Sequence, residues 1–354
     1  MNGPSVRPRD VAQSAVARPY FNAVVPPGDA SKHQGVRCYH ERVLVSVVVP
    51  VYNSEGSLPL LVERLAKVLE PGIALGELIL VNDESSDGSW SVVCKLAARH
   101  PWVHGVNLMR NYGQHNALLC GIRLAQFPVI VTIDDDLQTP PEEITRLLAK
   151  LAEGYDVVYG TPLKQTHGLF RDLASWFTKL ALQAAMGANT ARSVSAFRAF
   201  RTHLRNAFVN YSGPHVSIDV LLTWGTSRFT AIRVRNDERT IGVSNYTLGK
   251  LLRHAMNMMT GFSTLPLQLA SLTGFIFTIF GFLLFAYVLT RYFMEGGSVP
   301  GFPFLASAIA IFSGAQLFAL GIIGEYIARM HFRLMDRPSY AVLSSTGDNQ
   351  EPNA

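Results

Sequence analysis

Two long stretches without any Asp, Glu, Lys or Arg, residues 255–290 and 296–324, dominate the C-terminal part of this chain. A helix needs about 20 predominantly apolar residues to cross the hydrocarbon core of a bilayer, so each stretch is long enough for one span. Uncharged runs of this length are not typical of water-soluble domains, which carry more charged residues than this chain does. We therefore predict two transmembrane helices joined by a short loop, rather than two core helices of a soluble domain.

The charges that flank these stretches predict their orientation. Lys250 and Arg253 precede the first stretch, and Arg329, Arg333 and Arg337 follow the second, whereas the connection between them carries one basic and one acidic residue. Because cytoplasmic loops are enriched in Lys and Arg, both outer ends are expected in the cytoplasm. The formal net charge of +5 suits an anionic membrane surface. No segment is typical of a nucleic-acid-binding module, so nucleic acid is not an expected partner.

Between residues 43 and 160, short apolar runs alternate with helical patterns. The runs predict strands at residues 45–49, 77–81, 103–108, 129–133 and 156–159. The intervening patterns predict helices around residues 60–69, 89–99, 117–124 and 140–153. This alternation is typical of an α/β fold whose parallel sheet carries helices on both faces.

Polar residues gather directly after three of these strands, at 50–53, 82–87 and 134–138. The carboxyl ends of parallel strands lie at one edge of a sheet, and ligands bind there. Residues 134–136 are three consecutive Asp, whose ionised carboxylates repel one another unless a cation joins them. Mg²⁺ typically takes one or two carboxylates together with substrate phosphates. We therefore expect a divalent-metal site, the alternative being an acidic loop that caps a helix.

The polar segment 82–89 is a weaker signal, because Asn, Asp and Ser there can serve as turn and cap residues alone. Together with the acids expected at the same edge, it favours a polar, phosphorylated ligand. The chain has no Walker-type glycine loop and no GxGxxG, which disfavours an ordinary nucleotide hydrolase or dehydrogenase.

Several motifs resemble family 2 glycosyltransferases of the GT-A fold: VPVYN at 49–53, ND and DGS within 82–89, RNYGQHNA at 110–117, and DDDLQ at 134–138 followed by PPEE. More narrowly, they are similar to the polyprenyl-phosphate glycosyltransferases, which include dolichol-phosphate-mannose synthases, undecaprenyl-phosphate glucosyltransferases and, most similar, undecaprenyl-phosphate 4-deoxy-4-formamido-arabinose transferases. The resemblance runs from about residue 43 to 338 and includes both spans. It implies an inverting transfer of sugar from a nucleotide-sugar to a polyprenyl phosphate.

The resemblance also implies roles for matching residues. Asp134 and Asp136 would bracket the donor diphosphate through Mg²⁺ or Mn²⁺, with Gln138 as a further ligand and Asp136 counted as catalytic. Asp135 would face the sugar or the ribose. The other expected substrate-binding residues are Pro50, Tyr52 and Asp83 at the base and ribose, with Asn53, Asp87, Asn111, Gln114, Ser244 and Tyr246.

Two arginines complete the expected catalytic set. Arg198 matches a family arginine near the acceptor phosphate, and Arg239 lies in the segment that would close over the donor. Arginine suits bidentate recognition of a phosphate. The alternative is that both are solvated surface charges.

Three departures from the family pattern concern donor choice and any carboxylate base, but not the metal site. Ser54 stands where an acid is usual, although Glu55 is adjacent. Asn245 replaces a common lysine, and residues 192–197 contain no acid before the Phe-Arg pair.

The resemblance leaves other functions open. A transferase with another acceptor is one, although the Gln-x-x-Arg-Trp motif of processive synthases is missing; a catalytically silent membrane scaffold is another. Clustered acids without a ligand would be an electrostatic burden, which argues against the scaffold. A UDP-sugar is expected rather than a GDP-sugar, and a homo-oligomer, in particular a tetramer, is a further expectation.

The expected organisation places a multi-pass protein in the bacterial inner membrane with its catalytic domain in the cytoplasm. Its parts are a disordered tail (1–42), the GT-A domain (43–243), an amphipathic juxtamembrane helix (244–264), the first span (265–290), an external loop (291–303), the second span (304–327) and a cytoplasmic tail (328–354).

Overall fold

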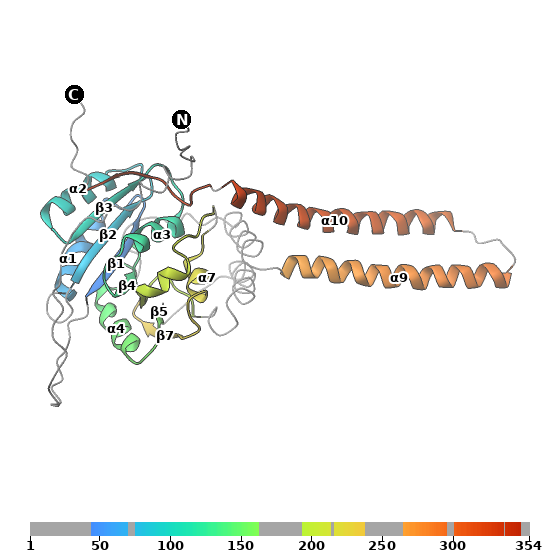
Figure 1. Ribbon diagram of the computed structural model, residues 1–354, viewed down its shortest axis with the longest axis horizontal. Coiled ribbons are helices and arrows are strands. Elements are labelled where there is room, and N and C mark those ends of the chain that lie inside the picture. The colour runs from blue at the N-terminus through green and yellow to red at the C-terminus, as the bar shows by residue number, and fades with distance from the viewer. Residues whose placement is uncertain are drawn as a thin grey trace, which may run out of the picture. The chain divides into compact units, whose positions relative to one another are not determined.

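The computed structural model describes residues 44–69, 75–162, 193–213, 216–237, 265–295, 301–335 and 337–347. These residues form an α/β domain and a pair of long helices (Figure 1). The tail expected at 1–42 and the helix expected at 244–264 lie outside the described residues.

One mixed, mostly parallel sheet forms the centre of the α/β domain. The strand order is β7-β5-β6-β4-β1-β2-β3-β8. β6 pairs antiparallel with β4 and β5, and β8 pairs antiparallel with β3, whereas the other pairings are parallel. The strands are β1 (Val45–Val51), β2 (Leu75–Asn82), β3 (Val103–Leu108), β4 (Val129–Thr132), β5 (Val157–Pro162), β6 (Arg198–Arg201), β7 (Phe229–Val234) and β8 (Val342–Ser345).

Helices cover both faces of this sheet, as the sequence predicts. β1 is buried along its whole length. Its residues Val45, Val47 and Val49 pack with side chains of α1 (Leu58–Leu69), α2 (Ser89–Arg99) and α4 (Ile144–Ala152) on one face. Val48 points to the other face, where α3 (Gln114–Leu124) and α7 (Ile218–Thr223) pack. Successive side chains of β1 point to opposite faces of the sheet, so the strand contributes to two separate apolar layers. Two 3₁₀ helices, Pro141–Glu143 and Thr202–Ala207, are the remaining elements among the described residues of the domain.

Two details of the strands differ from the prediction. β1 continues through Pro50 to Val51, because its pairing with β4 ends at Val48 and the missing N–H of Pro50 breaks no ladder on that side. The segment predicted as a tail, 328–354, contains regular structure: residues 328–334 continue α10, and residues 342–345 form β8. That strand is short and half polar, so its own sequence carries no strand pattern. It is extended because its backbone pairs with β3.

The long helices are α9 (Leu265–Glu295) and α10 (Phe302–Leu334). Both are long and apolar enough to cross a membrane, over Pro266–Arg291 and Ile311–His331. Among the described side chains of these two ranges, Pro266 and Ala270 are buried and most of the others are exposed. The helices contact each other through edge-on packing of Phe277 against Phe312. Side chains such as Phe282 (71% exposed) show that most of the apolar surface has no protein cover.

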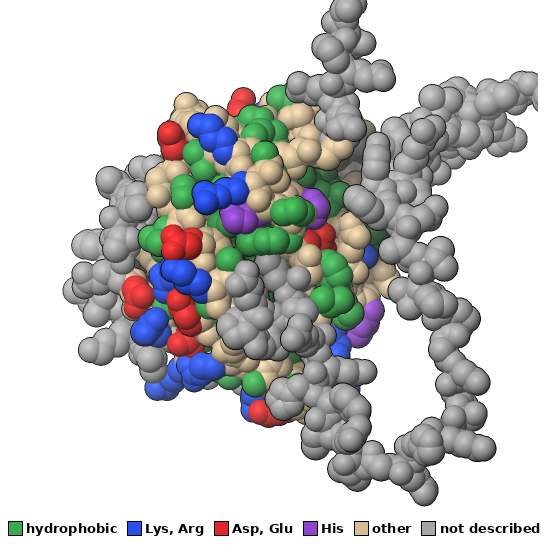
Figure 2. Space-filling model, turned by 90° about the vertical axis from the view of Figure 1, so that its left-hand side faces the viewer, with side chains coloured by type: hydrophobic (Ala, Val, Ile, Leu, Met, Phe, Trp, Pro, Cys, Tyr) green, Lys and Arg blue, Asp and Glu red, His purple; other side chains and the backbone are tan. Residues whose placement is uncertain are grey.

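The charges on the α/β domain are mixed on the face that Figure 2 shows. Acidic and basic side chains are interspersed there, with no patch of one sign. Ion pairs on the α/β domain include Arg64–Glu142 at 2.7 Å and Lys67–Glu63 at 2.5 Å. Among the described side chains on this face, basic residues form no continuous stripe (Figure 2).

Candidate active site

The loops after β1, β2, β3 and β4 lie together at the carboxyl edge of the sheet. In the described residues, three non-glycine residues have positive φ: Asn53 (53°), Glu84 (54°) and Leu137 (59°). Each follows one of these strands by a few residues. Left-handed backbone at ordinary residues persists only where the surroundings enforce it, and it is concentrated at functional sites. The carboxyl edge is therefore the strained edge of this sheet.

The loops after β1 and β2 are tied to each other. The Asn53 backbone N–H donates to Ser85 Oγ at 3.0 Å, and Asn53 Oδ1 accepts from the Ser86 N–H at 2.8 Å. Asp87 Oδ2 accepts from the Glu55 N–H at 3.1 Å. Asn53 and Asp87, both predicted to bind substrate, thus hold two loops in register at the predicted edge.

Asp83 holds the loop after β3. It is 3% exposed, and its two carboxylate oxygens accept from the backbone N–H groups of Tyr112 (2.7 Å) and Gly113 (2.8 Å). Burial raises the pKa of Asp83, although these two N–H groups oppose the rise. Gly113 has φ of 91°, so a glycine is required there. Asn111 joins this arrangement through its side-chain amide, which donates to the Asp83 carbonyl at 3.2 Å.

The three consecutive acids after β4 have three different sets of partners. Asp134 Oδ1 accepts from Gln114 Nε2 at 2.7 Å, which joins two predicted site residues. Asp135 Oδ2 accepts from the Tyr52 N–H at 3.2 Å and from the Ser54 hydroxyl. Asp136 Oδ1 accepts from the Gln138 N–H at 3.1 Å. The acids therefore stand side by side along the edge and face different loops.

The electrostatics of this acid loop are unfavourable. Burial, with the neighbouring charges of Asp136 and Asp135, raises the pKa of Asp134 to about 7, although Arg198 and Gln114 oppose the rise. Burial also raises the pKa of Asp135. Among the described residues no three His, Cys, Asp or Glu side chains converge on one point. One or two carboxylates with substrate phosphates are sufficient for Mg²⁺, so the oxygen donors here fit a hard divalent cation.

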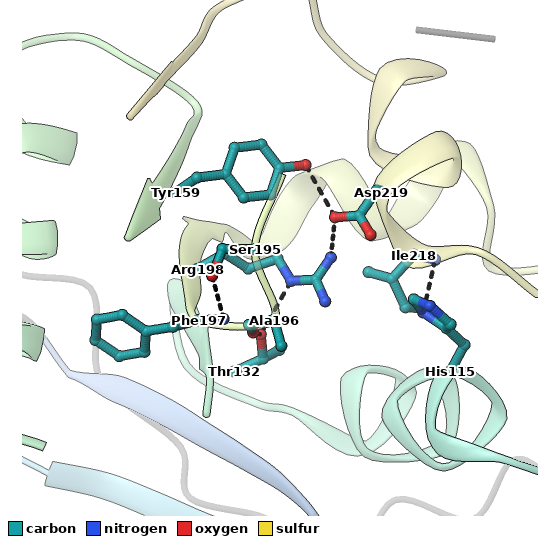
Figure 3. A network of polar contacts seen from close by, with 9 residues as sticks. All are labelled: His115, Thr132, Tyr159, Ser195, Ala196, Phe197, Arg198, Ile218 and Asp219. Carbon is teal, nitrogen blue, oxygen red and sulfur yellow. Dashed lines mark hydrogen bonds and ion pairs between the residues drawn. The ribbon is translucent and has the colours of Figure 1, made fainter. Parts of the chain in front are cut away.

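Arg198 lies inside the domain, at the start of β6 (Figure 3). It is 1% exposed and forms an ion pair with Asp219 of α7. Its Nε donates to Thr132 Oγ1 at 3.1 Å, and the Tyr159 hydroxyl donates to Asp219 Oδ1 at 3.1 Å. The interpretation of Arg198 as a solvated surface charge is therefore wrong. Its guanidinium connects the end of β4, just before Asp134, to α7.

Sequence reasoning missed Asp219 and the role of Ser54. Asp219 is an acid within the apolar run of α7, and a charge there needs a partner. It supplies to Arg198 the carboxylate that residues 192–197 lack. The Ser54 hydroxyl donates to Asp135, so an acid at position 54 would face a second carboxylate. Both departures from the family pattern thus have local physical reasons.

The remaining predicted residues are less directly placed. Pro50 is buried within β1, and Tyr52 is 51% exposed beside the acid loop. The Gln138 carbonyl accepts from the Asp237 N–H at 2.7 Å. The other predicted residues, Arg239, Ser244 and Tyr246, lie outside the described residues.

Comparisons with known proteins agree with this architecture. Residues 46–210 match the family model described as Glycosyl transferase family 2. The undecaprenyl-phosphate 4-deoxy-4-formamido-L-arabinose transferase of Yersinia enterocolitica is 36% identical over 313 residues, which cover 87% of this chain and 95% of that protein. The Photorhabdus laumondii protein of the same name is 36% identical over 310 residues, or 86% and 95% of the two chains.

Among solved structures, the glucosyl-3-phosphoglycerate synthase of Mycobacterium tuberculosis with Mn²⁺, UDP and glucosyl-3-phosphoglycerate is similar at a TM-score of 0.45. It is 19% identical, and the alignment covers 62% of this chain and 78% of that one. The two apolar helices, with relatives matched along almost their whole length, make this chain a membrane protein. The chain belongs to glycosyltransferase family 2, with a GT-A catalytic domain followed by two candidate membrane spans.

Proposed function

We propose that this protein is an inverting glycosyltransferase that moves a sugar from a UDP-sugar to undecaprenyl phosphate at the cytoplasmic face of the bacterial inner membrane. The observation that carries the proposal is the acid loop Asp134–Gln138 at the strained edge of a family 2 domain that continues into two apolar helices. Relatives that share 95% of their length with this chain are named for transfer to undecaprenyl phosphate.

The acceptor chemistry asks little of the protein. A phosphate monoester is already anionic at neutral pH, so its oxygen attacks the anomeric carbon without a strong general base. In-line displacement of the nucleoside diphosphate inverts the configuration at that carbon. The chain must therefore position two anionic groups against each other, which is a task for cations and backbone N–H groups rather than for a base.

The acid loop is proposed to hold the donor diphosphate through a divalent cation. Asp134 and Asp136 would be its carboxylate ligands and Gln138 a further one, because they offer the hard oxygen donors that Mg²⁺ and Mn²⁺ prefer. When bound, such a cation stabilises the negative charge of the leaving diphosphate. Asp135, held by Tyr52 and Ser54, is proposed to face the sugar or ribose.

The two arginines receive different proposed roles. Arg198 is buried and paired with Asp219, so we assign it to positioning of the acid loop and to the positive potential behind it. Arg239 is proposed to contact the substrate phosphates, a role that rests on its place in the sequence motif.

The membrane hairpin is proposed to bring the acceptor to this edge. Arg329 and Arg337 follow the apolar window of α10 or lie at its end, and a positive flank is typical of the cytoplasmic side. A homo-oligomer, in particular a tetramer, stays a prediction. Light scattering of the detergent-solubilised protein after size-exclusion chromatography checks it.

The deciding experiment is transfer of labelled sugar to undecaprenyl phosphate in detergent, with a panel of UDP- and GDP-sugars and with either Mn²⁺ or EDTA. We expect a chloroform-soluble product with one UDP-sugar and loss of that product in EDTA. A lipid product from a GDP-sugar would correct the donor. Nucleotide binding without any lipid product would favour another acceptor or the silent scaffold.

A further inference from the structure

The chain returns from the second membrane helix directly into the catalytic sheet. α10 ends at Leu334, and five residues later Ser339 is already buried in the α/β domain. β8 then pairs with β3 in the register Leu108↔Val342 and Val106↔Ser345. The pairing is antiparallel, so β8 begins beside the carboxyl end of β3. The chain therefore enters the sheet from the edge that carries the acid loop.

The segment Ser339–Thr346, which we call the C-terminal tether, is fastened at both ends. At its start, Ser339 Oγ accepts from the Gly213 N–H at 3.2 Å. Tyr340 lies 5.5 Å from the Arg123 guanidinium, and the Ala341 carbonyl accepts from the Met109 N–H at 2.9 Å. At its end, the Thr346 N–H donates to the Gly105 carbonyl at 2.9 Å, and Thr346 Oγ1 accepts from the Gly105 N–H at 2.9 Å.

Chain length now limits the distance between the sheet and the membrane helix. The path from Leu334 to Ser339 has five Cα–Cα steps, so it spans at most about 18 Å. This limit is covalent and holds for any tilt of the helices. The other connection to the hairpin, residues 238–264, is far longer and sets no comparable limit. The tether is thus the shorter covalent link between the catalytic sheet and the spans.

Coverage of the β3 edge alone is the competing explanation for β8, because exposed strand edges are commonly protected. The strand itself buries little, however: Val342 is 42% and Leu343 is 60% exposed. The more buried residues lie at its entry, nearest to α10: Ser339 is buried and Tyr340 is half-buried. That distribution suits a connection that fixes the sheet close to the end of α10, rather than a strand that mainly covers the β3 edge.

We propose that the C-terminal tether holds the carboxyl edge of the sheet against the bilayer surface, within reach of a phosphate at the lipid headgroup level. The inference rests on the proposed function, since it assumes an acceptor phosphate anchored in the membrane. The partner of this edge is the bilayer itself. Met109, which directly follows β3 at this edge, is 56% exposed and marks it for measurement.

The test lengthens the connection and leaves every tether contact in place. In the full chain, twelve Gly and Ser residues are inserted between Pro338 and Ser339. The matched control carries the same insertion after Gly347, beyond the tether. Each protein is assayed in vesicles with undecaprenyl phosphate, and in solution with a water-soluble phosphate of two isoprene units.

We expect the inner insertion to lower transfer to undecaprenyl phosphate at least about tenfold, because the effective concentration of the membrane-bound acceptor falls. Transfer to the short acceptor and the activity of the control should stay within about twofold of wild type. If the two insertion variants transfer sugar to undecaprenyl phosphate at the same rate, the proposed role of the tether is wrong. Loss with both acceptors would overturn it too, in favour of fold stabilisation. A wild-type protein inactive with both acceptors would instead refute the proposed function.

A second measurement needs no activity. Met109→Cys and Leu44→Cys place a fluorophore at the carboxyl and amino edges respectively, in a chain in which Cys38 and Cys94 are replaced by Ser. In nanodiscs with headgroup spin-labelled lipid, we expect strong quenching at position 109, weak quenching at 44, and loss of the difference after the inner insertion. Equal quenching at both positions in the uninserted protein contradicts the proposal.

Discussion

The two edges of the catalytic sheet surround their acids with different partners. At the amino edge, Asp156 accepts from Arg228 Nε at 3.0 Å and Nη2 at 2.8 Å, and from Thr226 at 2.6 Å. Partial burial raises the pKa of Asp156, but the bonds from Arg228 and Thr226 outweigh it and bring the pKa below the ordinary value. Further along the same edge, at the start of β2, Glu77 accepts from the Ser46 hydroxyl and from the Gln126 N–H, each at 2.6 Å.

At the carboxyl edge the balance is reversed. Asp134 and Asp135 form no ion pair within the described residues, and burial raises the pKa of both. Within the part of the chain that the structure describes, their oxygens accept from the Gln114 amide, the Ser54 hydroxyl and the Tyr52 backbone N–H. Asp156 has arginine partners at the amino edge, so this fold can neutralise an acid with a cation. The difference indicates that the amino-edge acids hold the fold and the carboxyl-edge acids are kept for a ligand.

One ion pair breaks this pattern, since Arg198 and Asp219 are buried at the carboxyl edge. Removing one partner leaves an uncompensated buried charge, so Arg198→Met should lower the free energy of unfolding by about 3–5 kcal/mol. The double variant Arg198→Met/Asp219→Leu should recover most of that loss. Thermal unfolding of the detergent-solubilised chain measures both.

The same variants separate positioning from direct acceptor binding. A positioning role predicts that the double variant, although stable, needs more Mn²⁺ for half-maximal activity, because the acid loop is less well placed. If Arg198→Ala instead folds normally and raises only the KM for the acceptor, Arg198 contacts the acceptor phosphate and our assignment is wrong.

The acid loop itself supplies the next test. Asp136→Asn should reduce transfer by about 10²–10³-fold, because a charge that acts on the diphosphate is lost. Its unfolding temperature should stay unchanged or rise, since repulsion between neighbouring carboxylates falls. Initial rates with saturating donor and a thermal melt are sufficient. Near-wild-type turnover would refute the metal-site assignment.

The sequence predicts the placement of the acid loop well, for a simple reason. An apolar strand followed by three acids is a local pattern, which can be recognised without knowing any distant contact. In the structure Asp134 lies at the edge of the sheet that this pattern predicts. The alternation of strands and helices up to residue 160 is equally local. Short-range periodicity determines these features, so a single sequence contains them.

Long-range pairing explains what the sequence did not predict. β8 joins β3 from more than 230 residues away, and its four residues Val-Leu-Ser-Ser carry no strand pattern. The role of Asp219 depends on its ion pair with Arg198, which lies on another element. Asn53 and Asp87 bind neighbouring loops in the structure, and no spacing rule distinguishes that from substrate contact. Side-chain partnership between elements is the information that a single sequence lacks.

At the amino edge, Asp156→Asn should lower the free energy of unfolding by about 1.5–3 kcal/mol, the usual value of hydrogen bonds to a charged group. Its pKa is depressed in the folded state, so the stabilisation is fully present above the unfolded value and is lost as pH falls through the folded value. The gap between wild type and variant should therefore be largest near pH 6 and shrink below about pH 4. Activity per folded molecule should not change, whereas a selective loss of activity would place Asp156 in the site.

The smallest expected effect lies at Ser54, where the two loops of the site meet. Ser54→Asp restores the acid that is usual in the family, but here it sets a second carboxylate against Asp135. Repulsion between two partly exposed carboxylates costs on the order of 1 kcal/mol, so the donor KM should rise about three- to tenfold with little change in kcat. Ser54→Asn, which keeps a donor without adding charge, is the matched control and should stay near wild type. A lower donor KM in Ser54→Asp would mean that the carboxyl edge tolerates a further acid, and the contrast between the two edges would lose its electrostatic basis.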